Sequence, residues 1–196
     1  MNILQAQNIT KYYGDNVVLQ DVSLVLKYGQ KMGLMAESGR GKTTLLHILA
    51  GLDVDFLGTI YSSAKIKGMV FQDLGLFSHK TVDENIMYPI RLQGGNARKH
   101  VLYQDWLELT GLCQYRTYYP HQLSRGMCQK VALIRAFLPN PELVFLDEPT
   151  SALDQESKKK IFAFLKCNYK ETACIMASHS TWELNQICNS VFELSL

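Results

Sequence analysis

The fold of this 196-residue chain is decided by the stretch Ala36-Glu37-Ser38-Gly39-Arg40-Gly41-Lys42-Thr43, a glycine-rich loop that ends in lysine and threonine. It matches the phosphate-loop pattern, with alanine in place of the usual first glycine. Apolar residues predict a short strand over Lys31–Ala36 and a helix from Lys42 to Leu52. This order sets the positive end of a helix against the loop, whereas the alternative is a chance strand-turn-helix with a surface lysine.

The chemistry of this loop points to a nucleotide phosphate. Small residues allow successive backbone N–H groups to converge on phosphate oxygens. Lys42 adds a positive charge, the Thr43 hydroxyl suits Mg²⁺, and Thr44 mainly begins the helix. Ala36 must enter with ordinary backbone angles or carry strain of about 1 kcal/mol. The residues predicted to contact the nucleotide here are Glu37, Ser38, Gly39, Arg40, Gly41, Lys42, Thr43 and Thr44.

A second motif combines an apolar strand with two acids. Leu143 to Leu146 are apolar, and Asp147 and Glu148 follow directly. A buried strand in a parallel sheet delivers such carboxylates to a ligand at the sheet edge, which is the Walker B pattern. Asp147 is expected to hold Mg²⁺, and Glu148 to orient and deprotonate an attacking water. An acidic pair standing alone would instead be read as helix capping.

The remaining pattern predicts an α/β protein. Alternation over Ile3–Asn8 and Val17–Leu26 predicts an antiparallel strand pair, and the middle of the chain reads as helix over Val82–Gly111 and Ser124–Leu138. The last third alternates strands with helices, which predicts a parallel sheet flanked by helices. Its expected elements are Leu143–Leu146, Glu156–Asn168, Ala173–Ala177, Thr181–Asn189 and Val191–Leu194.

Between these two motifs lies Gln122-Leu123-Ser124-Arg125-Gly126-Met127, which resembles the signature motif of the ABC (ATP-binding cassette) ATPase family. Four further family motifs are present in the family's order along the chain. They resemble the adenine-stacking loop, the Q-loop, the D-loop and the switch histidine, at Tyr12-Tyr13-Gly14, Phe71-Gln72-Asp73, Ser151-Ala152-Leu153-Asp154 and Ser178-His179. The resemblance covers almost the whole chain.

The resemblance implies a P-loop NTPase fold. A RecA-like parallel sheet core would carry an N-terminal antiparallel β subdomain and an inserted α-helical subdomain. In this chain the core would comprise residues 1–73 and 139–196, and the helical subdomain residues 74–138. All 196 residues would then form one ABC ATPase domain.

The resemblance also assigns roles to single residues. Tyr13 would stack on adenine, although a solvent-facing turn aromatic is the alternative. Gln72 would reach Mg²⁺ and His179 the γ-phosphate, against alternatives of a strand cap and a core histidine. Ser124 and Gly126 would act on the nucleotide of a second cassette, with Asp154 beside them. Arg125 and Met127 depart from the family's Gly and Gln, and Arg125 could add a cation near that triphosphate.

Composition restricts the partners. A formal net charge of +2 gives no reason to expect nucleic acid. No stretch approaches about 18 apolar residues, and Met1–Gly14 lacks the layout of a signal peptide. The resemblance implies separate transmembrane permease subunits, so we expect the chain at the cytoplasmic face of the membrane, held there peripherally through protein. The apolar segment Asp73–Tyr88 would border a groove for the permease, or serve internal packing.

The predicted function is ATP hydrolysis, with ATP and Mg²⁺, coupled to substrate transport. Tyr119–Ser124 with Met127 is similar to cassettes of the nitrate, sulfonate and taurine importer type. The competing hypothesis is a non-transport ABC ATPase in which ATP-driven pairing is a regulatory or mechanical switch. The sequence leaves open the cargo, the direction of transport and whether the two cassettes are identical.

Two other features are expected to be structural. The five cysteines show no close metal spacing, so we expect reduced, mostly buried side chains. Lys158, Lys159 and Lys160 are expected to form a solvated helix face.

Overall fold

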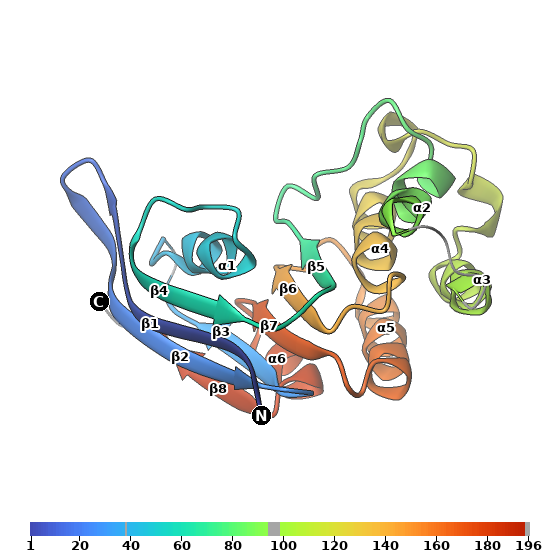
Figure 1. Cartoon of the computed structure of the whole chain (residues 1–196). Coiled ribbons are helices and arrows are strands. Elements are labelled where there is room, and N and C mark those ends of the chain that lie inside the picture. Colours follow the sequence, from blue (N-terminus) through green and yellow to red (C-terminus); the bar gives the residue numbers. More distant parts are fainter. Residues whose placement is uncertain (38, 94–98, 195–196) are drawn as a thin grey trace.

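Two sheets of different kinds organise the chain in the computed structural model, which describes residues 1–37, 39–93 and 99–194 (Figure 1). The first sheet is antiparallel, in the order β2-β1-β4, and comprises β1 (Asn2–Tyr13), β2 (Asn16–Lys27) and β4 (Leu57–Ser62). A tight turn joins β1 to β2, with Gly14 at φ +60°. The predicted antiparallel pair is confirmed, whereas β4 was not predicted.

The second sheet is parallel throughout. Its strand order is β5-β6-β7-β3-β8, and its members are β3 (Lys31–Met35), β5 (Lys67–Val70), β6 (Leu143–Asp147), β7 (Ala173–Ala177) and β8 (Ser190–Glu193). Because parallel strands end at one edge, the loops after β3, β6 and β7 meet there. This sheet, with the antiparallel strands and the helices, confirms the predicted α/β P-loop NTPase fold.

Six α-helices surround the sheets. They are α1 (Lys42–Ala50), α2 (Val82–Leu92), α3 (Lys99–Thr110), α4 (Arg125–Phe137), α5 (Gln155–Asn168) and α6 (Thr181–Ile187) in the part of the chain that the structure describes. The helical region predicted over Val82–Gly111 is two helices, and residues 94–98 lie outside the described ones. A capping box formed by Thr81 and Glu84 starts α2. None of the described helices is both long and apolar enough to span a bilayer.

Each face of the parallel sheet carries its own hydrophobic cluster. Every residue of β6 is buried, yet its side chains alternate between the two clusters. Val144 and Leu146 face α4 and α5, whereas Leu143 and Phe145 join α1 and the antiparallel sheet. The sheet is therefore covered on both sides, as parallel sheets require.

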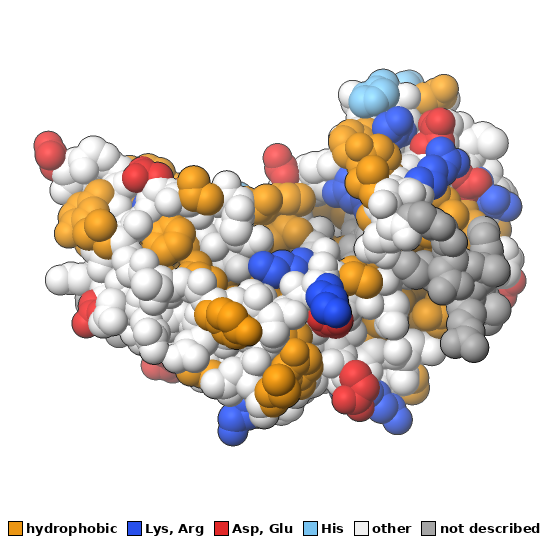
Figure 2. Space-filling view, in the orientation of Figure 1, with side chains coloured by type: hydrophobic (Ala, Val, Ile, Leu, Met, Phe, Trp, Pro, Cys, Tyr) orange, Lys and Arg blue, Asp and Glu red, His pale blue; other side chains and the backbone are white. Residues whose placement is uncertain are grey.

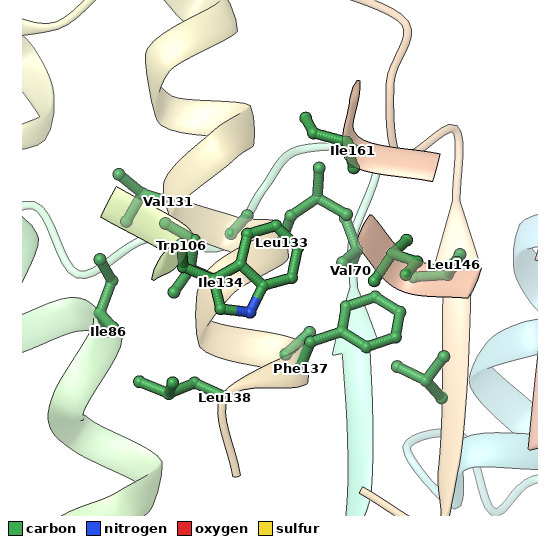
Figure 3. Packing of buried hydrophobic residues seen from close by; sticks show 14 of the residues in the cluster. Val70, Ile86, Trp106, Val131, Leu133, Ile134, Phe137, Leu138, Leu146 and Ile161 are labelled. Carbon is green, nitrogen blue, oxygen red and sulfur yellow. The ribbon is translucent and has the colours of Figure 1, made fainter. Parts of the chain in front are cut away.

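Trp106 ties the helical side together. It lies among aliphatic side chains of α4 and beside Phe137 (Figure 3), and its indole N–H donates to the Tyr169 hydroxyl over 2.9 Å. The same cluster continues through Ile161 of α5 to Leu146 of β6. A domain boundary at residues 73 and 139 stays a prediction, since the packing runs across it.

Two expectations about which side chains are buried were wrong. Among the cysteines only Cys174 is buried, while Cys113 and Cys167 are exposed and Cys128 and Cys188 are intermediate. Lys158 does not belong to a solvated face, because its ammonium bonds a buried carboxylate of α6 over 2.7 Å. The sequence could not show that α6 packs on this turn of α5.

Candidate functional site

The phosphate loop joins β3 to α1 and depends on two glycines. Gly39 and Gly41 have φ of +78° and +79°, a region that L side chains rarely adopt. A Cβ on Gly41 would lie 2.9 Å from the carbonyl oxygen of Val18 in β2, so only glycine fits this position. Ala36 is absent from the non-glycine residues with positive φ, which confirms that it enters the loop with ordinary backbone angles.

The lysine of the loop is buried and folded back over it. Lys42 is only 8% exposed, and its Nζ donates to the carbonyl oxygens of Ala36 at 2.7 Å and Glu37 at 3.1 Å. An ammonium group has three donors, so one remains for a ligand in the loop. Its position is therefore set by the backbone of the loop that it closes.

The start of α1 is open to an anion. Gly41 caps the helix without a side-chain hydrogen bond, and its first turn contains no acidic residue. The first intrahelical bond runs from the Leu45 N–H to the Gly41 carbonyl. The N–H groups before Leu45 therefore supply donors and the positive end of the helix dipole to the loop.

The acid pair ends β6 beside α1. The Thr43 hydroxyl donates to Asp147 Oδ2 over 2.6 Å, which joins the loop motif to the strand motif across 104 positions of sequence. Asp147 is 2% exposed. The alternative of an acidic pair that only caps a helix does not fit this contact, because Asp147 is the last residue of a buried strand.

Glu148 has a strained backbone held by its neighbours. Its φ is +48°, which is uncommon for a residue with a side chain and costs about 1–3 kcal/mol. Its N–H donates to the Ala177 carbonyl at 3.0 Å, and its own carbonyl accepts from the Gln129 side chain at 2.9 Å. Strand β7 and helix α4 thus impose the turn that directs the Glu148 carboxylate.

The Glu148 carboxylate meets the turn after β7. Its Oε1 accepts the backbone N–H of His179 over 2.8 Å, and the His179 Nε2 lies 3.7 Å from the same oxygen. Burial raises the pKa of the Glu148 carboxyl above its ordinary value, although the nearby His179 opposes this shift. A raised carboxyl pKa is the property expected of a group that accepts a proton from water.

These groups line one cavity of about 390 Å³. The structure brings together most of the residues predicted to act on a nucleotide, from the first strand to the turn after β7. Its walls are formed by Tyr13, Val18, Gly39, Gly41, Lys42, Thr43, Thr44, Gln72, Asp147, Glu148 and His179. Tyr13 is 54% exposed at the rim, where an aromatic face remains available. The alternative of a core histidine does not fit His179, whose side chain is 59% exposed and lines this cavity. Gln72 lines the same cavity.

Several predicted residues lie elsewhere. Glu37 and Arg40 form an exposed ion pair at 3.0 Å, so their side chains add nothing to the cavity wall. Ser124 caps α4 by accepting the Met127 N–H, and Asp154 caps α5. Neither residue lines the cavity, nor does Gly126. Ser38 lies outside the described residues.

Arg125 belongs to a second hollow beside the cavity. It is exposed, and with Gln72 and Asp73 it lines an adjoining hollow that also contacts Thr43. Gly126 follows it on α4, where a Cβ would lie 2.9 Å from the Ala152 carbonyl oxygen. The start of α4 therefore packs directly against the backbone of the loop that precedes α5.

Two residues that the motifs did not indicate also contribute to the site. Val18 lines the cavity from β2. Gln129 is 2% exposed and bonds Glu148, Ser151 and Ala152 through one amide. A polar side chain on the apolar face of the predicted helix was the available signal for Gln129.

The donors at the cavity fit Mg²⁺ bound together with a phosphate. Thr43, Asp147 and Gln72 supply oxygen atoms, the ligands that this hard cation prefers. Over the described residues no cluster of three or more His, Cys, Asp or Glu could hold a metal alone. Such a site needs phosphate oxygens to complete it, which is the usual arrangement for protein-bound Mg²⁺.

Comparison with known proteins gives consistent matches. A family model described as "ABC transporter" matches residues 19–151. The iron(III) ion import ATP-binding protein of Haemophilus influenzae is 36% identical over 81% of this chain, and the chain spans about half of that protein (49%). An uncharacterized ABC transporter ATP-binding protein of Methanocaldococcus jannaschii is 33% identical, over 98% of this chain and 95% of that protein. The methionine import ATP-binding protein of Clostridioides difficile is 34% identical over 96% and 64%.

A solved structure resembles the whole fold. An ATP-binding cassette, determined as a dimer in a post-hydrolysis state with ADP and Pi, superposes with a TM-score of 0.87. The identity is 27%, and the match covers 98% of this chain and 94% of that one. The arrangement of the two sheets and the helices is therefore shared with a protein whose nucleotide is known.

Proposed function

Because this chain belongs to the ABC transporter family of ATP-binding proteins, we propose that it binds and hydrolyses MgATP as the nucleotide-binding subunit of an importer. The observation that carries this proposal is the cavity at the edge of the parallel sheet. A lysine, a Thr–Asp oxygen pair and a glutamate with a raised pKa meet there from two separate segments, the phosphate loop and the end of β6. Neither segment could bind and cleave a triphosphate alone.

The residues divide the chemistry between them. Lys42 and the N–H groups at the start of α1 hold the outer phosphates. Thr43, Asp147 and Gln72 hold Mg²⁺, which when bound neutralises charge that develops on the phosphates. Glu148 orients the attacking water and accepts its proton, and His179 contacts the γ-phosphate. Tyr13 stacks on the adenine at the rim.

The second half of each site comes from another cassette. Ser124, Gly126 and Asp154 do not line the cavity of their own chain, while the related cassette was solved as a dimer. We therefore place these residues against the nucleotide of a partner, in a two-fold pair that closes when ATP binds.

A permease would dock in an apolar groove between β5, α2 and α4. This groove has a volume of about 330 Å³, and its apolar side chains include Phe71, Phe77, Tyr88, Pro89 and Leu92. Phe77 packs against Tyr88 with ring centroids 4.8 Å apart. Arg135 holds the groove's loop by donating to the carbonyl of Gly75 at 2.7 Å. The molecule's outline is hollowed between its sheet side and its helical side (Figure 2). A peripheral position on the cytoplasmic face of the membrane follows from such docking.

The cargo class rests on one segment. Tyr119–Ser124 with Met127 supports an importer of the nitrate, sulfonate or taurine type. The named relatives import iron(III) ions and methionine. Uptake assays would identify the cargo. Each candidate compound is offered to cells that carry the chain with its permease, and its uptake is compared with that of cells carrying the Glu148→Gln variant. Uptake of none of the three compounds would contradict this cargo class and leave the proposal of ATP hydrolysis intact.

Nucleotide binding and turnover test the core of the proposal. The purified chain should bind ATP in a Mg²⁺-dependent manner and release phosphate, and EDTA should abolish the release. Lys42→Met, which keeps the length of the side chain and removes its charge, should weaken binding by about tenfold or more. Arg40→Met removes a charge from the same loop, but the Arg40 side chain pairs with Glu37 at the surface. This variant should therefore bind ATP normally. Equal affinity of the Lys42→Met variant and the unaltered chain would contradict the site.

Co-purification separates a transporter subunit from a soluble switch. If the chain serves transport, a membrane protein should accompany it from detergent extracts, and Tyr88→Glu in the groove should release that protein. A non-transport ATPase would hydrolyse ATP in the same way but bring no membrane protein with it.

A further inference from the structure

The turn that carries His179 is held by a buried carboxylate. Glu183, in the first turn of α6, is 2% exposed and accepts the Ser178 hydroxyl at Oε2 over 2.7 Å. Its other oxygen, Oε1, accepts the Lys158 ammonium over 2.7 Å. Both oxygens are therefore paired, which a carboxylate requires in order to stay charged away from water.

The same network fixes the backbone on each side of His179. Ser178 accepts the Ser180 N–H at 3.1 Å with the hydroxyl oxygen whose proton goes to Glu183. The Ser180 hydroxyl in turn accepts the Glu183 N–H at 3.3 Å. These hydrogen bonds join Ser178, Ser180 and Glu183, which all lie close to His179 in the sequence. The turn therefore has little freedom while Glu183 stays paired.

This turn matters because the exposed side chain of His179 receives little support from packing. Its side chain is 59% exposed, so packing does not fix the ring. Its backbone N–H, in contrast, donates to Glu148 Oε1 over 2.8 Å. The turn therefore orients both the imidazole and the carboxylate that is proposed to accept the proton.

Lys158 connects this turn to another part of the site. It lies one helical turn after Asp154, and its N–H donates to the Asp154 carbonyl over 3.0 Å. Asp154 caps α5 at the end of the loop that resembles the family's D-loop. The ion pair thus joins the helix that starts at that loop to the helix that starts at the His179 turn.

We propose that Glu183 and Lys158 are positioning residues for ATP hydrolysis, which hold the Ser178–Ser180 turn so that His179 and Glu148 face the nucleotide together. This inference rests on the proposed function. Glu183 and Lys158 act on turnover and not on nucleotide affinity, since neither side chain lines the cavity.

Steady-state kinetics test the role. Lys158→Met and Glu183→Gln should each lower kcat by about tenfold to a hundredfold, as is usual when the partner that orients a functional group is lost. The Kd for MgATP should change by less than about threefold, because Lys42 and the loop remain intact. Lys158→Arg, which restores the charge-assisted bond, should recover most of the turnover.

The neighbouring lysine supplies the control. Lys159→Met makes the same change one position along α5, where the side chain is exposed, and should leave kcat unaltered. A kcat within twofold of the unaltered chain for both Lys158→Met and Glu183→Gln would overturn the inference. So would a loss confined to nucleotide binding.

A readout independent of turnover separates this inference from the proposed function. Amide hydrogen exchange of a peptide containing His179 should be faster in Lys158→Met and Glu183→Gln than in Lys159→Met, while a peptide from β1 exchanges equally in all three. If the unaltered chain does not hydrolyse ATP, the proposed function fails and exchange still reports on the turn. If it hydrolyses ATP but exchange around His179 is the same in all variants, only the positioning role fails.

Discussion

At the scale of single residues, Glu148 concentrates the chemistry of the site. Its backbone is strained at φ +48°, and burial raises its pKa. Glu148→Gln keeps the shape and the bond from the His179 N–H but removes the proton acceptor. We expect ATP turnover to fall by about a hundredfold or more, with MgATP binding retained and a long-lived ATP-bound pair formed. Phosphate release and size-exclusion chromatography with ATP would measure the two effects.

The control for this change is Glu156→Gln, which neutralises an exposed glutamate that pairs with Lys160 at the surface. It should turn over ATP normally, because exposed pairs of this kind contribute little. Ordinary turnover in Glu148→Gln would show that another group accepts the proton.

Gln129 is the second residue whose loss should be severe. Its amide serves the Glu148 carbonyl and the Ala152 N–H at once, in a buried setting. Gln129→Leu fills a similar volume but leaves the Ala152 N–H unpaired, while the Glu148 carbonyl keeps only the Ser151 N–H at 3.3 Å. This should lower the free energy of unfolding by about 1–3 kcal/mol. Turnover should fall as well, since the strained turn at Glu148 loses its support.

Urea unfolding and phosphate release would check these two outcomes for Gln129→Leu. Gln104→Leu makes the same substitution on the exposed face of α3, where the amide bonds Glu108. It should change neither stability nor turnover appreciably. Equal stability of the two variants would contradict the structural role assigned to Gln129.

At the scale of elements, the sequence predicted those whose signals are local. The four apolar residues before Asp147 predicted β6, and the glycine loop with the helix pattern after it predicted α1. Strands β4 and β5 were not predicted. In β4 the residues at both faces are mostly exposed or half-buried, so apolar alternation is weak. Strand β5 has only four residues and includes a glycine.

The glycine of β5 also shows why short strands escape prediction. A Cβ on Gly68 would lie 2.5 Å from the Ala136 carbonyl oxygen of α4, so tertiary packing, which no local pattern reports, demands glycine. Lys158 was misread for the same reason. Its partner Glu183 lies 25 positions away, on a helix whose packing against α5 the sequence does not encode locally.

Gly68→Ala therefore tests the contact between β5 and α4. The added methyl group meets a backbone oxygen that cannot move aside, so we expect a loss of about 1–3 kcal/mol in the free energy of unfolding. Gly33→Ala in β3 is the matched control, because its Cβ would meet the end of the flexible Leu184 side chain at 3.2 Å. Urea unfolding would compare the two. A larger loss in Gly33→Ala would contradict this assignment.

At the scale of the whole molecule, the parallel topology assembles the site. The loops after β3, β6 and β7 end at one edge of the sheet, which brings Lys42, Asp147 and His179 to one cavity. The motif order along the chain predicted these residues, but the sequence could not show their distances or the residues behind them. Ser124 and Gly126 stand apart from that cavity in their own chain, so the proposed function needs a second copy or a related cassette to complete the site.

Complementation between two inactive variants would test this shared site directly. Lys42→Met removes the charge of the phosphate loop. Ser124→Asp keeps the cap of α4, because aspartate caps helices as serine does, yet sets a negative charge against the partner's nucleotide. Each variant alone should be inactive, whereas an equal mixture should regain up to about one quarter of the original turnover, since half the pairs are mixed and each holds one intact site. A mixture of Lys42→Met with Glu148→Gln should regain none, because both lesions lie on the same half of the site. No recovery in the first mixture would show that each chain completes its own site, whereas recovery in the second would show that Lys42 and Glu148 act from opposite halves of the site.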